Sequence, residues 1–269
     1  MEISAPADWD TVDFLSDLHL DRADSPTLQG FAHYLQHSPA QAIFILGDLF
    51  EAWVGDDALD VHAGVEQAVA ALLQQTSQRA AIFILCGNRD FLMGPRLMQA
   101  CRAQALPDPS VLEFSKHRFL LTHGDAFCLG DTDYLAFRRL ARSEAWQQDF
   151  LNKPLAARQA LGQQMRAQSM AHQAAMRQRA GASWHDLDTP ACLQSLKVAR
   201  ADTMIHGHTH RPNTHPLAAG KTRWVLSDWD FECSPPRGDL LRLTHPTSGS
   251  ASHAQGPVLQ RLRAPQFNV

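Results

Sequence analysis

Five short apolar runs of this 269-residue sequence end in side chains that can bind metal ions. The runs are VDFLSD, AIFILGD, AIFILCGN, RFLLTH and TMIH, and their last residues are Asp17, Asp48, Asn88, His123 and His206. Two further imidazoles lie close by, namely His19 in SDLHL and His208 in HGHTH. Taken singly, each of these is an ordinary turn or loop residue. Together, carboxylate, carboxamide and imidazole groups without thiolate suit Mn, Fe or Zn, and they predict a metal centre.

Seven ligands are too many for one ion once water and substrate take their places, so we expect two ions that share a bridging carboxylate. The expected ligands of the first ion are Asp17, His19 and His208. Those of the second ion are Asn88, His123 and His206. Asp48 is expected to bridge both. Paired metal ions are a common arrangement for phosphoester hydrolysis, so the pattern indicates a hydrolase.

The apolar runs have the length and β-branched or aromatic character of buried strands, and helical patterns separate the early ones. Ser25 and Pro26 are a good N-cap and first-turn pair for a helix over 27–37. Further helices are predicted over 61–78 and 95–104. Alternating strands and helices predict an α/β fold with a largely parallel sheet, in which ligands bind at the carboxyl ends of the strands. The candidate ligands lie at those ends.

Composition narrows the class of protein. The apolar fraction is 45%, 19% of residues are charged, and the formal net charge is -4, which argues against bulk nucleic-acid binding. The N-terminus MEISAPADWD lacks the basic and apolar regions of a signal peptide, and we find no apolar run of membrane-spanning length. The five cysteines are odd in number and scattered. These features predict a cytoplasmic protein with reduced thiols.

The segment 131–199 interrupts the pattern of strands and ligands and has a helical pattern. Residues 132–182 hold eight basic and three acidic side chains, a local charge of +5, so the rest of the chain carries -4 - 5 = -9. A basic helical segment with Leu, Met and Trp could hold acyl chains and contact an anionic membrane. The alternative is a solvated helical hairpin packed on its own leucines.

The order D-x-H, GD, GN, H and GHxH resembles the calcineurin-like metallophosphoesterases. The blocks GDLFEAWVGDD, GNRDFLMG and IHGHTHRP are similar, more closely, to the UDP-2,3-diacylglucosamine hydrolases (diphosphatases) of the lipid A pathway of Gram-negative bacteria. The resemblance implies a four-layer α-β-β-α sandwich, formed by 1–130 and 200–269, with a helical cap inserted over 131–199. It also implies two divalent ions, expected to be Mn²⁺, and peripheral attachment to the cytoplasmic face of the inner membrane.

The reaction that this resemblance implies is hydrolysis at the nucleotide-side phosphorus, which yields UMP and 2,3-diacylglucosamine 1-phosphate. Many metallophosphoesterases have a histidine after the GN pair, whereas this sequence has Arg89. Arginine stays protonated and cannot act as a general acid, but it can clamp a phosphate and stabilise transition-state charge. A phosphomonoester, with a second pKa of about 6, leaves without a proton. Arg89 therefore favours a diphosphate substrate, with Arg89 and Asp48 as the expected catalytic residues, unless another residue such as His210 supplies a proton.

The resemblance also implies contacts to the substrate. The expected residues are Asn88, Arg89, Asp131, Ser169 and His206. The cap departs from the family pattern at two positions, where Gln173 and Met176 replace an asparagine and a lysine. Two other functions stay open from the residues alone. One is a soluble metallophosphoesterase that acts on another phosphodiester or dinucleotide, and the other is an interaction module without turnover.

Overall fold

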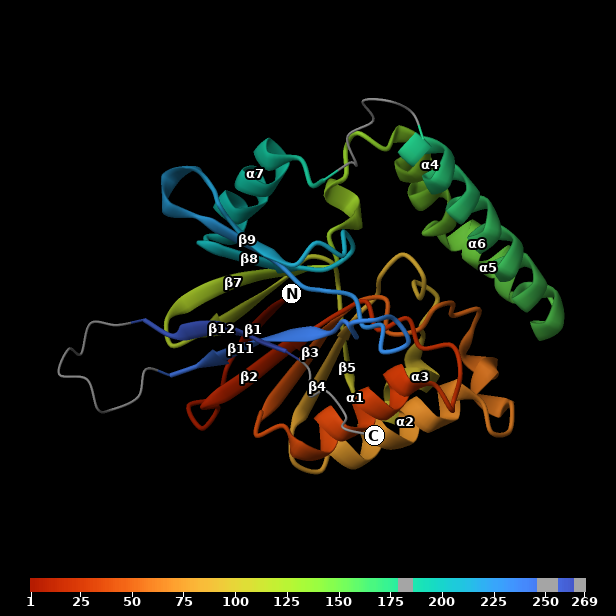
Figure 1. The fold of residues 1–269 in the computed structure, drawn as a ribbon, viewed down its shortest axis with the longest axis horizontal. Coiled ribbons are helices and arrows are strands. Elements are labelled where there is room, and N and C mark those ends of the chain that lie inside the picture. The colour runs from red at the N-terminus through yellow and green to blue at the C-terminus, as the bar shows by residue number, and fades with distance from the viewer. Residues whose placement is uncertain (179–185, 246–255, 264–269) are drawn as a thin grey trace.

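Two β-sheets pack face to face between helices, and a further group of helices stands to one side (Figure 1). The computed structural model describes residues 1–178, 186–245 and 256–263, and for 169–178 it describes the backbone only. Helices on the outer faces of both sheets complete a four-layer α-β-β-α arrangement, as the sequence predicts.

The first sheet carries the early candidate ligands. In spatial order its strands are β12 (Val258–Arg263), β11 (Asp239–Thr244), β2 (Thr11–Leu15), β3 (Ala42–Leu46), β4 (Ala81–Leu85) and β5 (Gln104–Leu106). The last four are mutually parallel, with Leu15 opposite Ile45 and Leu46 opposite Leu85. Because their carboxyl ends are aligned, the residues that follow β2, β3 and β4 meet at one edge.

The second sheet brings the later candidates to the same end of the molecule. In spatial order its strands are β1 (Glu2–Ser4), β6 (Ser110–Phe114), β7 (His117–Thr122), β8 (Thr203–His206), β10 (Thr222–Val225) and β9 (Asn213–Pro216). Strands β7 and β8 are parallel, and Thr122 lies opposite His206. This register places His123, directly after β7, beside the end of β8.

Residues alternate between two cores along the buried strands, as the two-residue period of a strand requires. In β3, Ile43 and Ile45 pack toward the helices, whereas Phe44 and Leu46 pack between the sheets. Phe44 stacks on Phe83 of β4, with ring centroids 4.5 Å apart. Both faces of the central strands are therefore buried, which explains their continuous apolar sequences.

Helices α1 (Pro26–His37), α2 (Val65–Thr76) and α3 (Pro95–Cys101) cover the first sheet. The first matches the predicted 27–37, and its N-cap Ser25 accepts a hydrogen bond from the Leu28 backbone N–H. The other two are shorter than predicted. Residues Asp56–Asp60 form a separate 3-10 helix before α2, and α3 ends where Arg102 adopts φ +51° and the chain turns into β5.

The predicted insertion 131–199 contains four helices. They are α4 (Thr132–Ala141), α5 (Glu144–Leu151), α6 (Leu155–Gln178) and α7 (Thr189–Ala199). Helix α7 packs on the outer face of β7 and β8 through Cys192 and Leu196, so it forms the fourth layer. Helices α4 to α6 stand apart from the sheets, and we call them the cap (Figure 1). In the part of the chain that the structure describes, we find no helix with the length and apolarity to cross a bilayer.

Candidate metal centre

The loops after the parallel strands converge at one end of the two sheets. Asp17, His19, Asp48 and His208 all have φ between +49° and +68°, a backbone region that residues other than glycine rarely adopt. The loops are held to one another by backbone bonds, including His19 N–H to the Asp48 carbonyl at 3.0 Å and Asp17 N–H to the Gly47 carbonyl at 3.0 Å. Such conformations cluster where a structure aims side chains at a common point.

Buried donor atoms face one another at the centre of this site. Asp48 Oδ2 lies 3.7 Å from His123 Nε2 and 3.9 Å from His19 Nε2, and Asp17 Oδ1 lies 4.0 Å from His19 Nε2. Asp17, Asp48 and His123 offer ligand atoms that all lie within 4.8 Å of one another. Ligand bonds to divalent ions of this class are about 2.0–2.2 Å long, so atoms that share an ion lie up to about 4 Å apart. The separations are therefore compatible with a shared cation.

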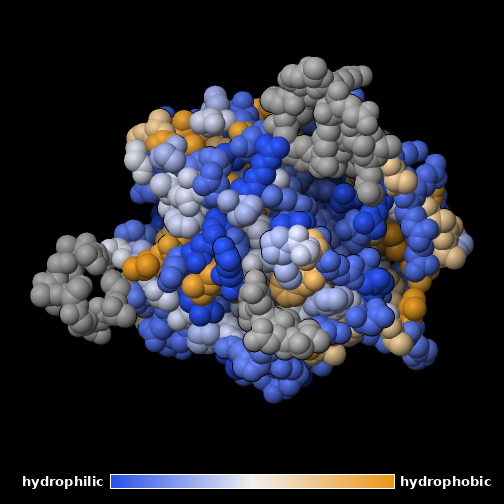
Figure 2. All heavy atoms as spheres, viewed as in Figure 1, coloured by the Kyte–Doolittle hydropathy of each residue, from blue (hydrophilic) through white to orange (hydrophobic). Residues whose placement is uncertain are grey.

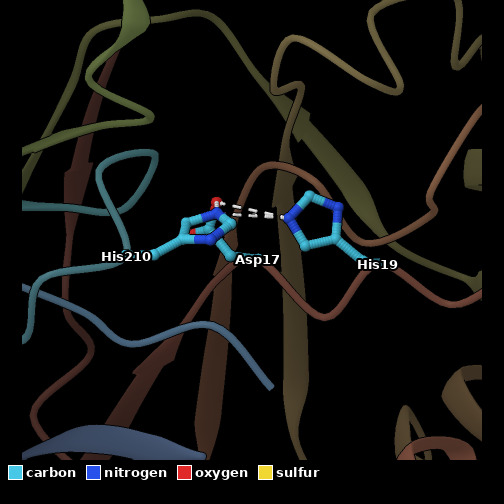
Figure 3. A group of neighbouring side chains, drawn as sticks. All are labelled: Asp17, His19 and His210. Carbon is cyan, nitrogen blue, oxygen red and sulfur yellow. Dashed lines mark hydrogen bonds and ion pairs between the residues drawn. The ribbon is translucent and has the colours of Figure 1, made fainter. Parts of the chain in front are cut away.

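The imidazole nearest to Asp17 and His19 is that of His210. Figure 3 shows the Asp17 carboxylate and the His210 ring overlapping in this view, with the His19 ring beside them. His210 Nε2 is 3.3 Å from Asp17 Oδ1 and 3.3 Å from His19 Nε2. From the sequence, we considered His210 only as an alternative proton donor, and we expected His208 to be the ligand beside Asp17 and His19. The signal was present, since His210 is the third imidazole of HGHTH.

The His208 ring lies with the second group of predicted ligands. Its Nδ1 is 2.8 Å from Asn88 Oδ1, which is also 3.0 Å from His123 Nε2. The His208 backbone N–H nevertheless donates to both carboxylate oxygens of Asp17, at 3.0 and 3.2 Å. His208 therefore bridges the two predicted groups, with its backbone on one and its ring on the other.

His206 is fully buried at the end of β8. Its Nδ1 lies 2.8 Å from the Gly207 carbonyl oxygen, and its Nε2 is 3.4 Å from Arg223 Nη1. Arg223 is itself paired with Asp186, at 2.7 Å. Burial, together with the Arg223 charge, lowers the pKa of His206 to about 3. The ring is therefore neutral at physiological pH, which is the form that binds a metal ion.

Burial and neighbouring charges perturb the other groups as well. Burial lowers the pKa of His208 to about 4, with the nearby His123 adding to the effect. Burial would also lower the pKa of His123, but the carboxylates of Asp48 and Asp17 outweigh it and raise this pKa to about 9. Burial opposes ionisation of Asp17, yet neighbouring histidines hold its pKa far below the ordinary value. The Asp17 carboxylate thus stays charged in a buried pocket, which favours a bound cation.

Asp90, which the sequence analysis missed, fastens two of the ligand loops together. It is fully buried, and its carboxylate accepts backbone hydrogen bonds from Gly87 at 2.7 Å, Leu49 at 2.8 Å and Asp48 at 3.3 Å. Asp48 in turn accepts a bond from the Arg89 backbone N–H at 2.8 Å. The CGNRD block therefore also positions Asp48.

The cap contacts the ligand loops through a second buried carboxylate, Asp125, two residues after His123. Asp125 Oδ2 accepts from the Tyr134 hydroxyl at 2.5 Å and from Arg138 Nε at 2.7 Å. Arg142 Nη2 is 3.5 Å from the same oxygen and donates to the Gly87 carbonyl at 2.9 Å. Helix α4 is therefore fixed against the loops that precede Asn88 and follow His123.

Two predicted substrate contacts belong to the cap. The Asp131 carboxylate caps α4 by accepting a hydrogen bond from the Tyr134 backbone N–H at 3.0 Å. The Tyr134 ring stacks near that of His208, with centroids 6.1 Å apart, so the start of α4 adjoins the site. Ser169 lies on α6, and its side chain is outside the described residues, as are those of Gln173 and Met176.

Comparison with known proteins identifies the family. Residues 11–212 match the family model described as calcineurin-like phosphoesterase. A UDP-2,3-diacylglucosamine hydrolase of Ralstonia nicotianae is 43% identical over 86% of this chain and 88% of its own. This chain belongs to the UDP-2,3-diacylglucosamine hydrolase family of calcineurin-like phosphoesterases. Enzymes of the same name from Xanthomonas axonopodis pv. citri and Bordetella pertussis are 42% and 38% identical, over 86% and 84% of this chain and 94% and 88% of theirs.

Membership of this family makes the protein a hydrolase of the metallophosphoesterase class. The matched region 11–212 contains all seven predicted ligands and extends through the cap. Together with the cluster of buried carboxylate and imidazole groups, it indicates a site for divalent metal ions.

Proposed function

We propose that this protein hydrolyses the diphosphate bond of UDP-2,3-diacylglucosamine and releases UMP and 2,3-diacylglucosamine 1-phosphate, in lipid A synthesis. The observation that carries the proposal is 43% identity to an enzyme of that name over nearly the whole chain. The Arg89 side chain, in the position where many relatives of the wider class hold a histidine, supports a substrate whose leaving group needs no proton.

Two divalent ions fit the residues that face one another. The donor set is two carboxylates, one carboxamide and four imidazoles without thiolate, which favours Mn²⁺ over a structural thiolate-bound zinc. We propose Asp48 as the bridge, because its Oδ2 faces His19 on one side and His123 on the other. The sequence predicts Asp17, His19 and His208 around one ion, and Asn88, His123 and His206 around the other. The ring positions instead favour His210 beside Asp17 and His19, and His208 beside Asn88 and His123. The side chain of His208 is half-buried, and the two ring nitrogens of His206 already face the Gly207 carbonyl and Arg223.

The bound ions would supply a nucleophilic water at neutral pH and neutralise phosphate charge. The protein's own contribution is orientation and charge. Water attacks the nucleotide-side phosphorus, and the bond from that phosphorus to the bridging oxygen breaks, so the sugar phosphate leaves as a monoester. We propose that Arg89 clamps the diphosphate, since its Nε has no protein partner and its Nη1 lies 3.9 Å from Glu51. Asn88 and His206 would contact the same phosphate.

The cap is the proposed site for the acylated sugar. It adjoins the candidate metal centre through α4, where Asp131 and Tyr134 lie. We propose that Asp131 and Ser169 contact the substrate. One Asp131 oxygen accepts from the Tyr134 backbone N–H, and the other would accept a hydrogen bond from the substrate. Helix α4 and its flanks also expose three large apolar side chains, with Leu129 46%, Phe137 38% and Leu140 57% exposed.

These apolar side chains also support peripheral attachment to the cytoplasmic face of the inner membrane. Figure 2 shows hydrophobic patches interleaved with hydrophilic ones on the side where the cap lies in Figure 1. The basic residues support attachment less than the sequence predicted, because Arg138 and Arg142 are paired with Asp125. We therefore propose attachment through apolar contact, with Arg139 as the exposed basic residue of α4.

The test is turnover in H₂¹⁸O by purified protein supplied with Mn²⁺. Attack at the nucleotide-side phosphorus places one ¹⁸O atom in UMP and none in the sugar phosphate, which mass spectrometry separates. UDP-glucose and bis(p-nitrophenyl) phosphate are the controls, since each lacks the acyl chains. Label in the sugar phosphate would refute the proposed point of attack. Equal turnover of bis(p-nitrophenyl) phosphate would refute the proposed substrate.

A further inference from the structure

Glu51 has a fixed place beside the candidate metal centre. It lies five residues after the end of β3, in GDLFEAW, where the chain runs beside the segment that follows β2. The Glu51 backbone N–H donates to the Leu20 carbonyl at 3.1 Å, and Leu20 and Phe50 form a parallel bridge. The backbones that carry Glu51 and His19 are therefore tied together.

The two carboxylate oxygens of Glu51 have different partners. Oε2 lies 3.0 Å from His19 Nδ1, and Oε1 lies 2.7 Å from Nε of Arg166 on the cap helix α6. Arg89 Nη1 is 3.9 Å from Oε1. The Glu51 side chain is only 11% exposed, so its contacts with these groups are largely shielded from water.

We propose that Glu51 is a positioning residue that orients His19 for metal binding and anchors the cap helix α6 to the same site. A histidine ligand usually donates its second ring N–H to a carboxylate or carbonyl, which fixes the ring. With Nδ1 facing Glu51, Nε2 is directed at the Asp17 and Asp48 carboxylates, 4.0 and 3.9 Å away. The inference rests on the proposed metal centre and adds a residue outside its ligand set.

The chemistry of both partners requires an acceptor. Arg166 can only donate, and His19 must donate from Nδ1 if Nε2 is to bind a metal ion. A carboxylate can accept from both at once. The Glu51 oxygens lie 3.0 and 2.7 Å from these nitrogens as ion-pair contacts, and a small rotation of either side chain would align them as hydrogen bonds. In Glu51→Gln, one side of the amide is a donor, so it opposes either His19 or Arg166. In Glu51→Asp, the charge remains but the side chain is one methylene shorter and cannot keep both contacts.

Because one carboxylate serves both partners, the metal centre and the cap are coupled through it. A metal ion on His19 Nε2 would hold the ring, and with it the Glu51 oxygens that receive Arg166. A bound ion would therefore stabilise the docked position of α6, and by reciprocity the docked α6 would strengthen binding of the ion. Both effects are expected to disappear when Glu51 no longer joins the two.

The first experiment is Mn²⁺ titration of metal-free protein by calorimetry, with Glu51→Gln beside the matched control Glu66→Gln on α2. We expect Glu51→Gln to weaken one of two ions by about 10- to 100-fold, Glu51→Asp to recover part of the loss, and the control to bind as wild type. If Glu51→Gln binds two ions with unchanged affinity, the inference about Glu51 is overturned and the proposed metal centre is not. A wild type that binds no Mn²⁺ would instead overturn the proposed metal centre, and the inference with it.

The second experiment reads the cap directly and does not depend on turnover. Hydrogen exchange of the α6 amides over 159–168 is measured with and without Mn²⁺. We expect Mn²⁺ to slow exchange in wild type, and to have no such effect in Glu51→Gln or in Arg166→Gln. An equal Mn²⁺ effect in wild type and both variants would overturn the link between cap and metal.

Discussion

Arg158 anchors the cap helix α6 to the core, so its removal should release the cap without disturbing the candidate ligands. The guanidinium is 3% exposed and reaches the loop that follows Trp53. Nη1 donates to Asp57 Oδ1 at 2.9 Å and to the Val54 carbonyl, Nη2 pairs with the second Asp57 oxygen, and Nε donates to the Lys153 carbonyl at 2.8 Å. We consider Arg158→Met, with Arg139→Met on exposed α4 surface as the control.

The expected cost follows from these contacts. Loss of the guanidinium leaves two carbonyl oxygens without this donor, at about 1–3 kcal/mol for each that water cannot reach. The ion pair adds less, because Asp57 is 42% exposed and solvated pairs contribute about 0–1 kcal/mol. We expect a loss of about 2–4 kcal/mol in the docking of α6, which corresponds to about 30- to 900-fold faster amide exchange there.

The pH dependence has a defined sign. The hydrogen bond from Arg158 holds the pKa of Asp57 below its ordinary value. Its contribution to docking is therefore present above pH about 3.9 and is lost as pH falls through the lowered folded pKa. Arg158→Met should abolish this acid-dependent release of α6.

The assay is hydrogen exchange over α6 at neutral and acidic pH, together with KM for the UDP-lipid. We expect faster exchange and a higher KM, with metal content unchanged. The reasoning fails if exchange over α6 in Arg158→Met is no faster than in Arg139→Met, because the buried contacts would then contribute nothing to docking.

Three further outcomes test the proposed function. Asp48→Asn should lower the number of bound metal ions and the turnover rate far more than it lowers the free energy of unfolding. A variant that keeps two ions and a near-normal rate would exclude Asp48 as the bridge. Arg89→His should retain metal but lose rate on the diphosphate, since one well-placed donor to transition-state charge contributes about 3 kcal/mol, and wild-type hydrolysis of alkyl phosphodiesters at the UDP-lipid rate would contradict this role. Leu140→Glu should weaken binding to anionic vesicles but not turnover in detergent micelles, and unchanged vesicle flotation would argue against attachment through α4.

Local signals in the sequence predicted the parts of the fold that depend on local chemistry. Helix α1 was predicted within a residue because Ser25 and Pro26 mark its start. Helix α2 begins four residues later than predicted because 56–60 form a turn of their own, in which Asp56 accepts backbone bonds from Gly94 and Arg96 at 2.9 Å each. Those partners are 38 and 40 residues away along the chain, so periodicity could not reveal them.

In the candidate site, too, some residues could be predicted from local sequence and others could not. Residues that end buried strands were found because parallel strands must bring their ends together. The groups that orient them were missed, since Asp90, Glu51 and Asp125 act through contacts with other loops and with the cap. His210 is the intermediate case, because the spacing of HGHTH does not determine which ring turns toward Asp17.

Pairing within the molecule accounts for part of the charge asymmetry of the chain. The cap is basic and the core acidic, and the structure pairs them, with Arg138 on Asp125, Arg166 on Glu51 and Arg158 on Asp57. Asp125 and Glu51 lie two and three residues after the candidate ligands His123 and Asp48, and Asp57 lies in the 3-10 helix farther along the chain from Asp48. Part of the +5 excess of this segment is therefore balanced by acidic residues of the core. Because these pairs hold the cap over the ligand loops, a change of cap charge should alter substrate binding before it alters membrane attachment.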